Sequence, residues 1–179
     1  VGIAGFGYLT NDFGDREADL KAQKANLLLE ISGAQIVLLL LLFLSLAILP
    51  WILYFPLNVW TVSLLAGEFF LFLIYTLPPI RLKERGFLGL AVDALYAHVN
   101  PVVLAAITFD MLAVHPKAHL AWLLVPLAAW QFCLGLRNIL LHQLKDAPNG
   151  LRSGIRTFVT SKGEKAGFGL LAQAVVPME

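Results

Sequence analysis

Residues 31–54 restrict the fold of this chain more than any other stretch, because they form one long apolar run without a charged side chain. A helix needs about 20 apolar residues to cross the hydrocarbon core of a bilayer, and this run is long enough. Trp51 and Tyr54, near its end, are residues that favour the membrane–water interface. We therefore expect a membrane-spanning helix from Ile31 to Tyr54.

Other long apolar stretches follow the same pattern, at residues 57–77, 87–113 and 120–141. The composition agrees, since 59% of the residues are hydrophobic and 14% are charged, against about 45–50% and 25% in soluble domains. The sequence therefore predicts an all-α fold, a polytopic transmembrane helical bundle that forms a single domain over residues 1–179.

The two ends of the sequence are also apolar. Residues 1–10 are typical of the end of a membrane helix, with glycines at 2, 5 and 7 that allow close helix packing. Another span begins near Gly167. We therefore expect an incomplete chain with about four full spans and two partial ones. Missing transmembrane helices of the same protein, or neighbouring subunits, would complete the bundle.

The distribution of positive charge predicts the orientation in the membrane. Of the 13 Lys and Arg residues, 12 lie on the side that carries residues 11–24, 81–85 and 137–165, which leaves Lys117 on the other side. Such a bias marks the cytoplasmic side of an integral, multi-pass membrane protein.

No basic tract suggests nucleic acid as a partner. Cys133 is the single cysteine, which excludes an intrachain disulfide and a Cys-based metal site.

An acidic motif follows the first apolar residues: Asn11-Asp12-Phe13-Gly14-Asp15-Arg16-Glu17-Ala18-Asp19. The spacing of Asp12, Asp15 and Asp19 places all three carboxylates on one face of a helix. Converging carboxylates repel one another unless a cation lies among them, and Mg²⁺ prefers such oxygen ligands. The alternative is a solvated acidic helix end, but acidic residues at the mouth of a membrane bundle are costly and usually functional.

Two basic stretches lie on the same predicted side. Lys24 belongs to the segment after the motif, which is either an ordinary basic membrane-edge loop or a phosphate clamp beside the metal. After Tyr75, two prolines end the second span, and Arg81, Lys83 and Arg85 follow on a short loop. A basic loop after a span is routine, so position alone does not assign these cations to a substrate.

Polar residues also interrupt the second and third spans. Glu68 shares a helix face with Tyr75, and a buried acid there either faces the interior of the bundle or makes a structural hydrogen bond to a neighbouring helix. The third span carries a predicted cavity-lining stripe of Asp93, Tyr96, Ala97 and Asn100. We expect His98 to lie off this stripe as a structural histidine, and Pro101 to kink the helix.

The fourth span ends with a second polar face, formed by Asn138, His142 and Asp146 at intervals of four residues. A histidine with an aspartate suggests proton transfer. No serine or cysteine nucleophile accompanies them, which argues against a hydrolase. A loop rich in Ser, Thr, Gly and basic residues follows at 151–165.

The three polar segments together resemble the UbiA superfamily of intramembrane prenyltransferases. The first motif matches the family pattern N-D-x-x-D-x-x-x-D at every fixed position, and Tyr75-x-x-Pro-Pro-x-Arg81-Leu-Lys83 is similar to the diphosphate-holding loop of the chlorophyll-synthase branch. The second family motif, D-x-x-x-D, falls on Asp146 with Gly150 in place of the second aspartate. The usual N-R-P-x-R-P after the first motif is missing.

The resemblance implies magnesium-dependent transfer of an isoprenyl group from a prenyl diphosphate to an acceptor within the membrane. It implies Mg²⁺ as the cofactor, with the diphosphate, the acceptor and membrane lipid as partners. The implied metal ligands are Asp12, Asp15, Asp19, Asp146 and Asn149. The implied substrate-binding residues are Asn11, Lys24, Tyr75, Arg81, Lys83 and Asn149, with Glu68, Asp93 and His142 towards the acceptor. The alternative is a non-catalytic subunit that binds polyprenyl lipid or has a structural role, with a degenerate second motif.

Overall fold

The computed structural model describes residues 1–112 and 120–178, and the regular structure in these ranges is helical. Four helical segments are long and apolar enough to cross a membrane: Gly33–Leu53, Val59–Thr76, Phe87–Asp110 and Trp122–Arg152. They coincide with the four expected full spans, so the all-α bundle is confirmed. Lys117, predicted to lie on the side opposite the other basic residues, is outside the described residues.

Helix α1 (Gly2–Ala22) passes through the whole acidic motif without a break. It ends at Gln23, whose left-handed backbone (φ 53°) directs the chain towards α2 (Gly33–Leu53). The motif is therefore helical, as the spacing of its aspartates predicts, and the helix continues well beyond the apolar residues 1–10. The motif lies on the last three turns of α1, so the helix fixes the direction of each acidic side chain.

Small residues let α1 pack closely against its neighbours α2, α3 (Val59–Thr76) and α6 (Leu120–Ser153). A Cβ atom on Gly2 would lie 2.3 Å from the backbone nitrogen of Ala47 in α2. A Cβ atom on Gly14 would lie 2.9 Å from the carbonyl oxygen of Thr76, at the end of α3. The contact at Gly14 holds the acidic motif against the end of α3, where the basic loop begins.

The third span contains a wide turn. Helices α4 (Phe87–Ala94) and α5 (Asn100–Leu112) are joined by a π-helical turn, Leu95–Val99, in which Asn100 N–H donates to the Leu95 carbonyl. Pro101 follows directly and has no N–H to donate, so the expected proline kink takes the form of a π turn. The same arrangement recurs before Pro177, where Leu171–Val175 is π-helical.

The fourth span is longer than expected, because α6 continues past Leu141 to Ser153 and includes Pro148. The second polar face, formed by Asn138, His142 and Asp146, therefore lies entirely within α6. The chain then turns through α7 (Phe158–Lys162) into α8 (Glu164–Leu170) and α9 (Val176–Met178). These last helices pack on α6, and the expected helix near Gly167 starts three residues earlier, at Glu164.

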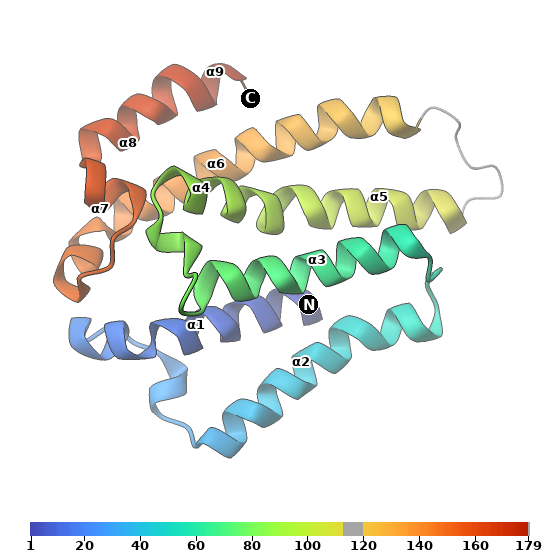
Figure 1. The fold of residues 1–179 in the computed structure, drawn as a ribbon, viewed down its shortest axis with the longest axis horizontal. Helices are drawn as coiled ribbons and strands as arrows, with labels where there is room; N and C mark the ends of the chain where they lie inside the picture. Colours follow the sequence, from blue (N-terminus) through green and yellow to red (C-terminus); the bar gives the residue numbers. More distant parts are fainter. Residues whose placement is uncertain (113–119, 179) are drawn as a thin grey trace.

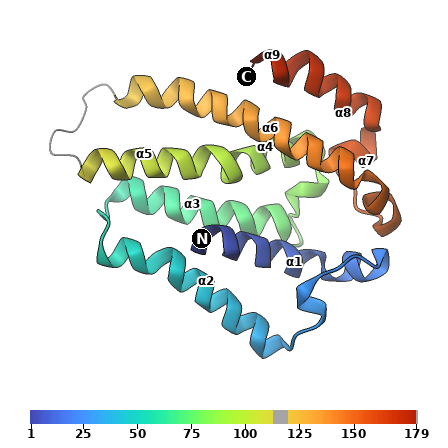
Figure 2. The same cartoon turned by 180° about the vertical axis from the view of Figure 1, so that it is seen from behind.

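Figures 1 and 2 show that the polar segments gather at one end of the bundle. The end of α1, the loop between α3 and α4, and the end of α6 with α7 lie there, while the connection between α2 and α3 lies at the opposite end. An even number of candidate spans separates these segments, so they share one end of the bundle, as the charge distribution predicts.

Single-cysteine labelling tests this arrangement. In a Cys133→Ala background, we expect Arg85→Cys and Arg152→Cys to react with a membrane-impermeant maleimide from one side only. Leu57→Cys and Lys117→Cys should react only from the other side, because an odd number of spans separates them from the basic loops. Labelling of Leu57→Cys from the same side as Arg85→Cys would contradict the topology.

Candidate functional site

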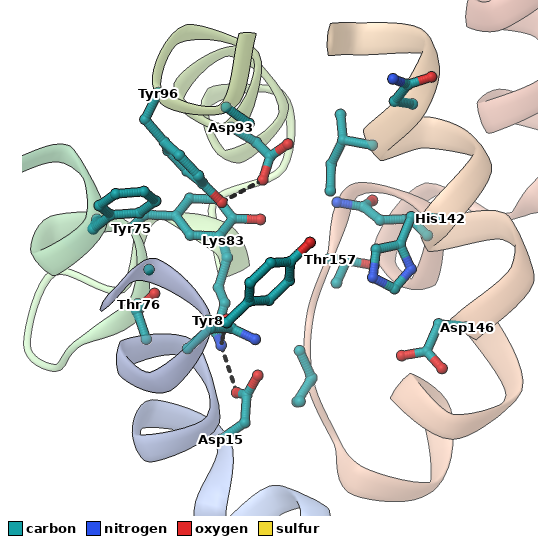
Figure 3. Close-up of a pocket in the computed structure, with 18 of the residues that line it drawn as sticks. Tyr8, Asp15, Tyr75, Thr76, Lys83, Asp93, Tyr96, His142, Asp146 and Thr157 are labelled. Atoms are coloured by element: carbon teal, nitrogen blue, oxygen red, sulfur yellow. Dashed lines mark hydrogen bonds and ion pairs between the residues drawn. The ribbon is translucent and has the colours of Figure 1, made fainter. Parts of the chain in front are cut away.

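A cavity of about 680 Å³ lies between α1, α3, α4 and α6. Residues of the acidic motif, the α3–α4 loop and the end of α6 line its polar end. Ile3, Ala4, Phe72 and Pro101 line its inner part. Figure 3 shows the two walls, with Asp15, Lys83 and Asp93 facing His142 and Asp146 of α6. The cavity thus combines a charged mouth with a mainly apolar interior.

On α1 the polar residues that line the cavity are Tyr8, Asn11, Asp15 and Asp19, which follow helical spacing. Asp12 lies at the margin of this stripe and is not part of the lining. Burial raises the pKa of the Asp12 carboxyl, and the nearby carboxylates of Asp19 and Asp15 raise it further. The three acids are therefore close enough to repel one another, but Asp15 and Asp19 are the two that face the cavity.

Asp15 is the most heavily paired of these acids. Lys83 Nζ donates to Asp15 Oδ1 at 2.5 Å and to Asn11 Oδ1 at 3.2 Å, and Arg81 Nη2 donates to Asp15 Oδ1 at 2.9 Å. Lys83 is buried, and burial lowers the pKa of its ammonium group, while Asp15 counters part of that shift. The charge on Lys83 therefore depends on keeping an anion beside it.

Arg81 approaches Asp15 from outside the cavity. It donates to the Gly14 carbonyl oxygen at 2.6 Å and pairs with Glu84, and it is not part of the cavity lining. Sequence reasoning placed Arg81 among the substrate-binding residues. The geometry instead has its guanidinium group brace α1 against the loop, while Lys83 from the same loop reaches the cavity.

The remaining acids of the mouth, Asp19 and Asp146, also have partners. Asp19 is buried and accepts a hydrogen bond from Asn26 Nδ2 at 2.8 Å. Lys24 Nζ lies 3.4 Å from Asp146 Oδ2, and Asn149 Nδ2 donates to Asp146 Oδ1 at 2.8 Å. The first and second motifs therefore face each other across the cavity and are joined through Lys24.

Tyr75, Asp93 and Tyr96 form a polar cluster above Lys83 (Figure 3). The Tyr96 hydroxyl donates to Asp93 Oδ2 at 2.6 Å, and the ring centroids of Tyr75 and Tyr96 are 5.1 Å apart. Deeper in the bundle, Asn100 Nδ2 donates to Glu68 Oε2 at 2.5 Å and to the Leu64 carbonyl at 3.0 Å. Both expectations for Glu68 hold, because it makes this interhelical bond and also lines the cavity.

The π turn changes the predicted stripe of the third span. Asp93, Tyr96 and Ala97 line the cavity as expected, but the extra residue in the turn brings His98 into the lining and directs Asn100 towards Glu68. His98 Nε2 lies 3.4 Å from Asn138 Nδ2 of α6. The expectation that His98 lies off the stripe was wrong because it assumed regular 3.6-residue turns.

Comparison with protein families agrees with this geometry. A model of the UbiA prenyltransferase family matches residues 1–178. The chain belongs to the UbiA prenyltransferase family. No curated protein and no solved structure matches it in the corresponding searches. Proteins of the UbiA family act on prenyl diphosphates in membranes, so the chain is an integral membrane protein of a transferase family.

Metal dependence is general in the UbiA family, and the donor set can be tested against it. Among residues 1–112 and 120–178, no group of three or more His, Cys, Asp or Glu side chains is arranged to hold a metal ion. Asp15, Asp19, Asp146 and the amides Asn11 and Asn149 nevertheless bring hard oxygen ligands to the cavity. These residues fit a Mg²⁺ site in which the protein supplies one or two carboxylates, and substrate phosphate and water complete the coordination shell.

Sequence reasoning missed Tyr8 and Thr157, which both project into the cavity (Figure 3). Tyr8 precedes Asn11 by three residues and Asp15 by seven, so the α1 stripe extended by one turn would have found it. Thr157 caps α7, where its hydroxyl accepts a hydrogen bond from the Thr160 N–H. Only the tertiary fold brings Thr157 back to the mouth.

Proposed function

We propose that this UbiA family chain transfers an isoprenyl group from a prenyl diphosphate to an acceptor within the membrane, in a magnesium-dependent reaction. The observation that carries the proposal is the cavity itself. At its mouth, Asp15 paired with Lys83 lies opposite Asp146 paired with Lys24, and an apolar interior lies directly behind. A charged head group and an isoprenoid tail fit these two parts respectively.

Each residue of the mouth has a role in this proposal. Lys83 and Lys24 hold diphosphate oxygens, Tyr75 lies beside them, and Arg81 positions Asp15 from behind. Asp15, Asp19, Asp146 and Asn149 hold the metal, Asn11 orients it, and Asp12 adds negative charge at the rim. Mg²⁺ bound here would offset the charge that develops on the leaving diphosphate. The cations of the chain act in the same direction.

The inner groups suit the acceptor. Apolar side chains such as Phe72 exclude water, which protects an allylic cation from hydrolysis. Glu68, Asp93 and His142 all line the cavity and can accept hydrogen bonds or a proton from an acceptor that reaches it. We place the mouth at the cytoplasmic side, on the strength of the Lys and Arg bias.

The second candidate is a non-catalytic protein that binds polyprenyl lipid or acts as a structural membrane subunit. The observation that favours it is Gly150, which stands where the family pattern has its last aspartate and leaves Asp146 as the one full charge of that motif. In that case the cavity would retain a lipid without releasing diphosphate.

Release of diphosphate decides between the two candidates. We expect the detergent-purified protein, supplied with a lipid extract of membranes as the source of acceptor, to release diphosphate from farnesyl or geranylgeranyl diphosphate when Mg²⁺ is present, and to stop when EDTA is added. The rate is measured by stopping the reaction, restoring excess Mg²⁺ in every sample, and then converting the released diphosphate to phosphate with pyrophosphatase for a phosphate assay. Retention of either lipid without release, in the presence of Mg²⁺, would favour the non-catalytic candidate.

A further inference from the structure

Two ion pairs occupy the mouth of the cavity. Lys83 is 2.5 Å from Asp15, and Lys24 is 3.4 Å from Asp146. Within the described part of the chain, these are the two lysines that line the cavity. Each pair joins different elements, since Lys83 reaches from the α3–α4 loop to α1, and Lys24 reaches from the segment after α1 to α6.

These pairs oppose the binding of either ligand alone. A divalent cation that approaches Asp15 meets Lys83 and Arg81, and one that approaches Asp146 meets Lys24. A diphosphate that approaches the lysines meets the carboxylates already bound to them. Like charges at contact distance repel strongly where water is partly excluded. Each ligand alone must therefore displace an existing partner and leave one charge unpaired.

Both ligands together remove this obstacle. If diphosphate takes the two lysines and the metal takes the two carboxylates, every charge keeps a partner of opposite sign. We propose, on the basis of the function proposed above, that Lys24 and Lys83 are internal counter-ions that exchange their carboxylates for diphosphate, so that metal and diphosphate bind the cavity as one unit. Linkage then requires each ligand to tighten the other by the same factor.

The two lysines differ in how readily they move. The Lys83 side chain is 7% exposed and is held by Asn11 as well as Asp15, so it stays at the site and changes partner in place. The Lys24 side chain is 44% exposed, and its partner Asp146 is 35% exposed. Exposed pairs are weak. The Lys24–Asp146 ion pair can therefore break at a small cost in free energy. Lys24 is the lysine that moves when ligands bind between α1 and α6.

Binding measurements without turnover test the proposal. In detergent solution without diphosphate, Mn²⁺ affinity is measured by electron paramagnetic resonance for wild type, Lys24→Met and Lys83→Met. We expect Mn²⁺ to bind about two- to fivefold more tightly to Lys24→Met, because a weak exposed pair is lost, and about tenfold more tightly to Lys83→Met, because a buried competitor is lost. Lys21→Met is the matched control, since Lys21 is exposed and lies outside the cavity lining.

The second arm follows radiolabelled inorganic diphosphate, with its free concentration corrected for the metal complex formed without protein. We expect diphosphate to bind wild type about tenfold or more tightly with Mg²⁺ than with EDTA. In Lys24→Met we expect a smaller difference between the two conditions. Equal Mn²⁺ affinity in wild type and Lys24→Met, or equal diphosphate affinity with Mg²⁺ and with EDTA, would overturn the proposal. If size-exclusion chromatography shows that Lys83→Met does not fold, the measurements on Lys24→Met are sufficient to test the proposal.

The outcomes also separate this proposal from the proposed function. Coupled binding without release of diphosphate from any prenyl diphosphate would overturn the transferase function and keep the exchange of partners. If the protein releases diphosphate but binds metal and diphosphate independently, the transferase function is kept and the exchange of partners is overturned.

Discussion

Asp15→Asn is expected to reduce magnesium-dependent release of diphosphate by about 100- to 1000-fold, the range that follows the loss of one strong electrostatic contact to a reacting group. Asp15 faces the cavity and is the point where Lys83 and Arg81 converge. Asparagine keeps the size of the side chain and an acceptor oxygen but removes the charge. The variant therefore leaves two cations without their shared anion and removes a proposed metal ligand.

Asp12→Asn is the matched control for this prediction. It makes the same change three residues earlier, on a side chain outside the cavity lining, so we expect a loss of about tenfold, as for residues that support a metal site indirectly. Far-ultraviolet circular dichroism and size-exclusion chromatography verify that both variants fold. A rate for Asp15→Asn within threefold of wild type would remove Asp15 from the proposed mechanism.

The four spans could be predicted from the sequence because the thickness of a bilayer sets a minimum length of apolar chain. Residues 31–54, for example, contain no charge, and α2 occupies Gly33–Leu53 of them. The small residues before the motif were also informative, since Gly2 does allow α1 to approach the backbone of α2. The sequence patterns therefore predicted which segments cross the membrane and which polar segments share an end.

The positions of individual site residues depended on features that ideal periodicity omits. The π turn at Leu95–Val99 changes the face presented by His98 and Asn100, and no regular 3.6-residue pattern encodes that change. Tertiary pairing was also hidden. Arg81 and Lys83 stand two residues apart on one loop, yet one braces the helix from behind and the other lines the cavity. Their roles depend on where α1 packs, which composition does not specify.

The second motif gives the other large expected effect. Asp146→Ala should lower the rate of diphosphate release about 100-fold and raise the Mg²⁺ concentration needed for half-maximal rate. Asn149 can offer a neutral carbonyl oxygen there, but it adds no charge, and in the structure its amide donates to Asp146. No second carboxylate of this motif remains to compensate. Unchanged rate and unchanged Mg²⁺ dependence would mean that this part of α6 is not a metal site.

Restoring the family aspartate should have the opposite effect. Gly150 lies inside α6 and is not among the glycines with positive φ, so its backbone accepts an aspartate. A Cβ atom there would lie 2.9 Å from the Thr160 methyl group, which makes Gly150→Asp alone strained. Thr160→Ser removes that methyl group and keeps the hydroxyl that donates to the Ile155 carbonyl at 2.9 Å.

We therefore expect the double variant Gly150→Asp with Thr160→Ser to tighten the apparent Mg²⁺ affinity about tenfold, because the affinity of such sites follows the number of charged ligands. Thr160→Ser alone should behave as wild type, and Gly150→Asp alone should show a smaller gain with a lower midpoint of thermal unfolding. Magnesium titration of diphosphate release in the three variants measures each effect. If the double variant folds but its Mg²⁺ dependence equals that of wild type, a side chain at position 150 does not reach the metal. Asp146 and Asn149 would then be the only metal ligands that α6 supplies in this proposal.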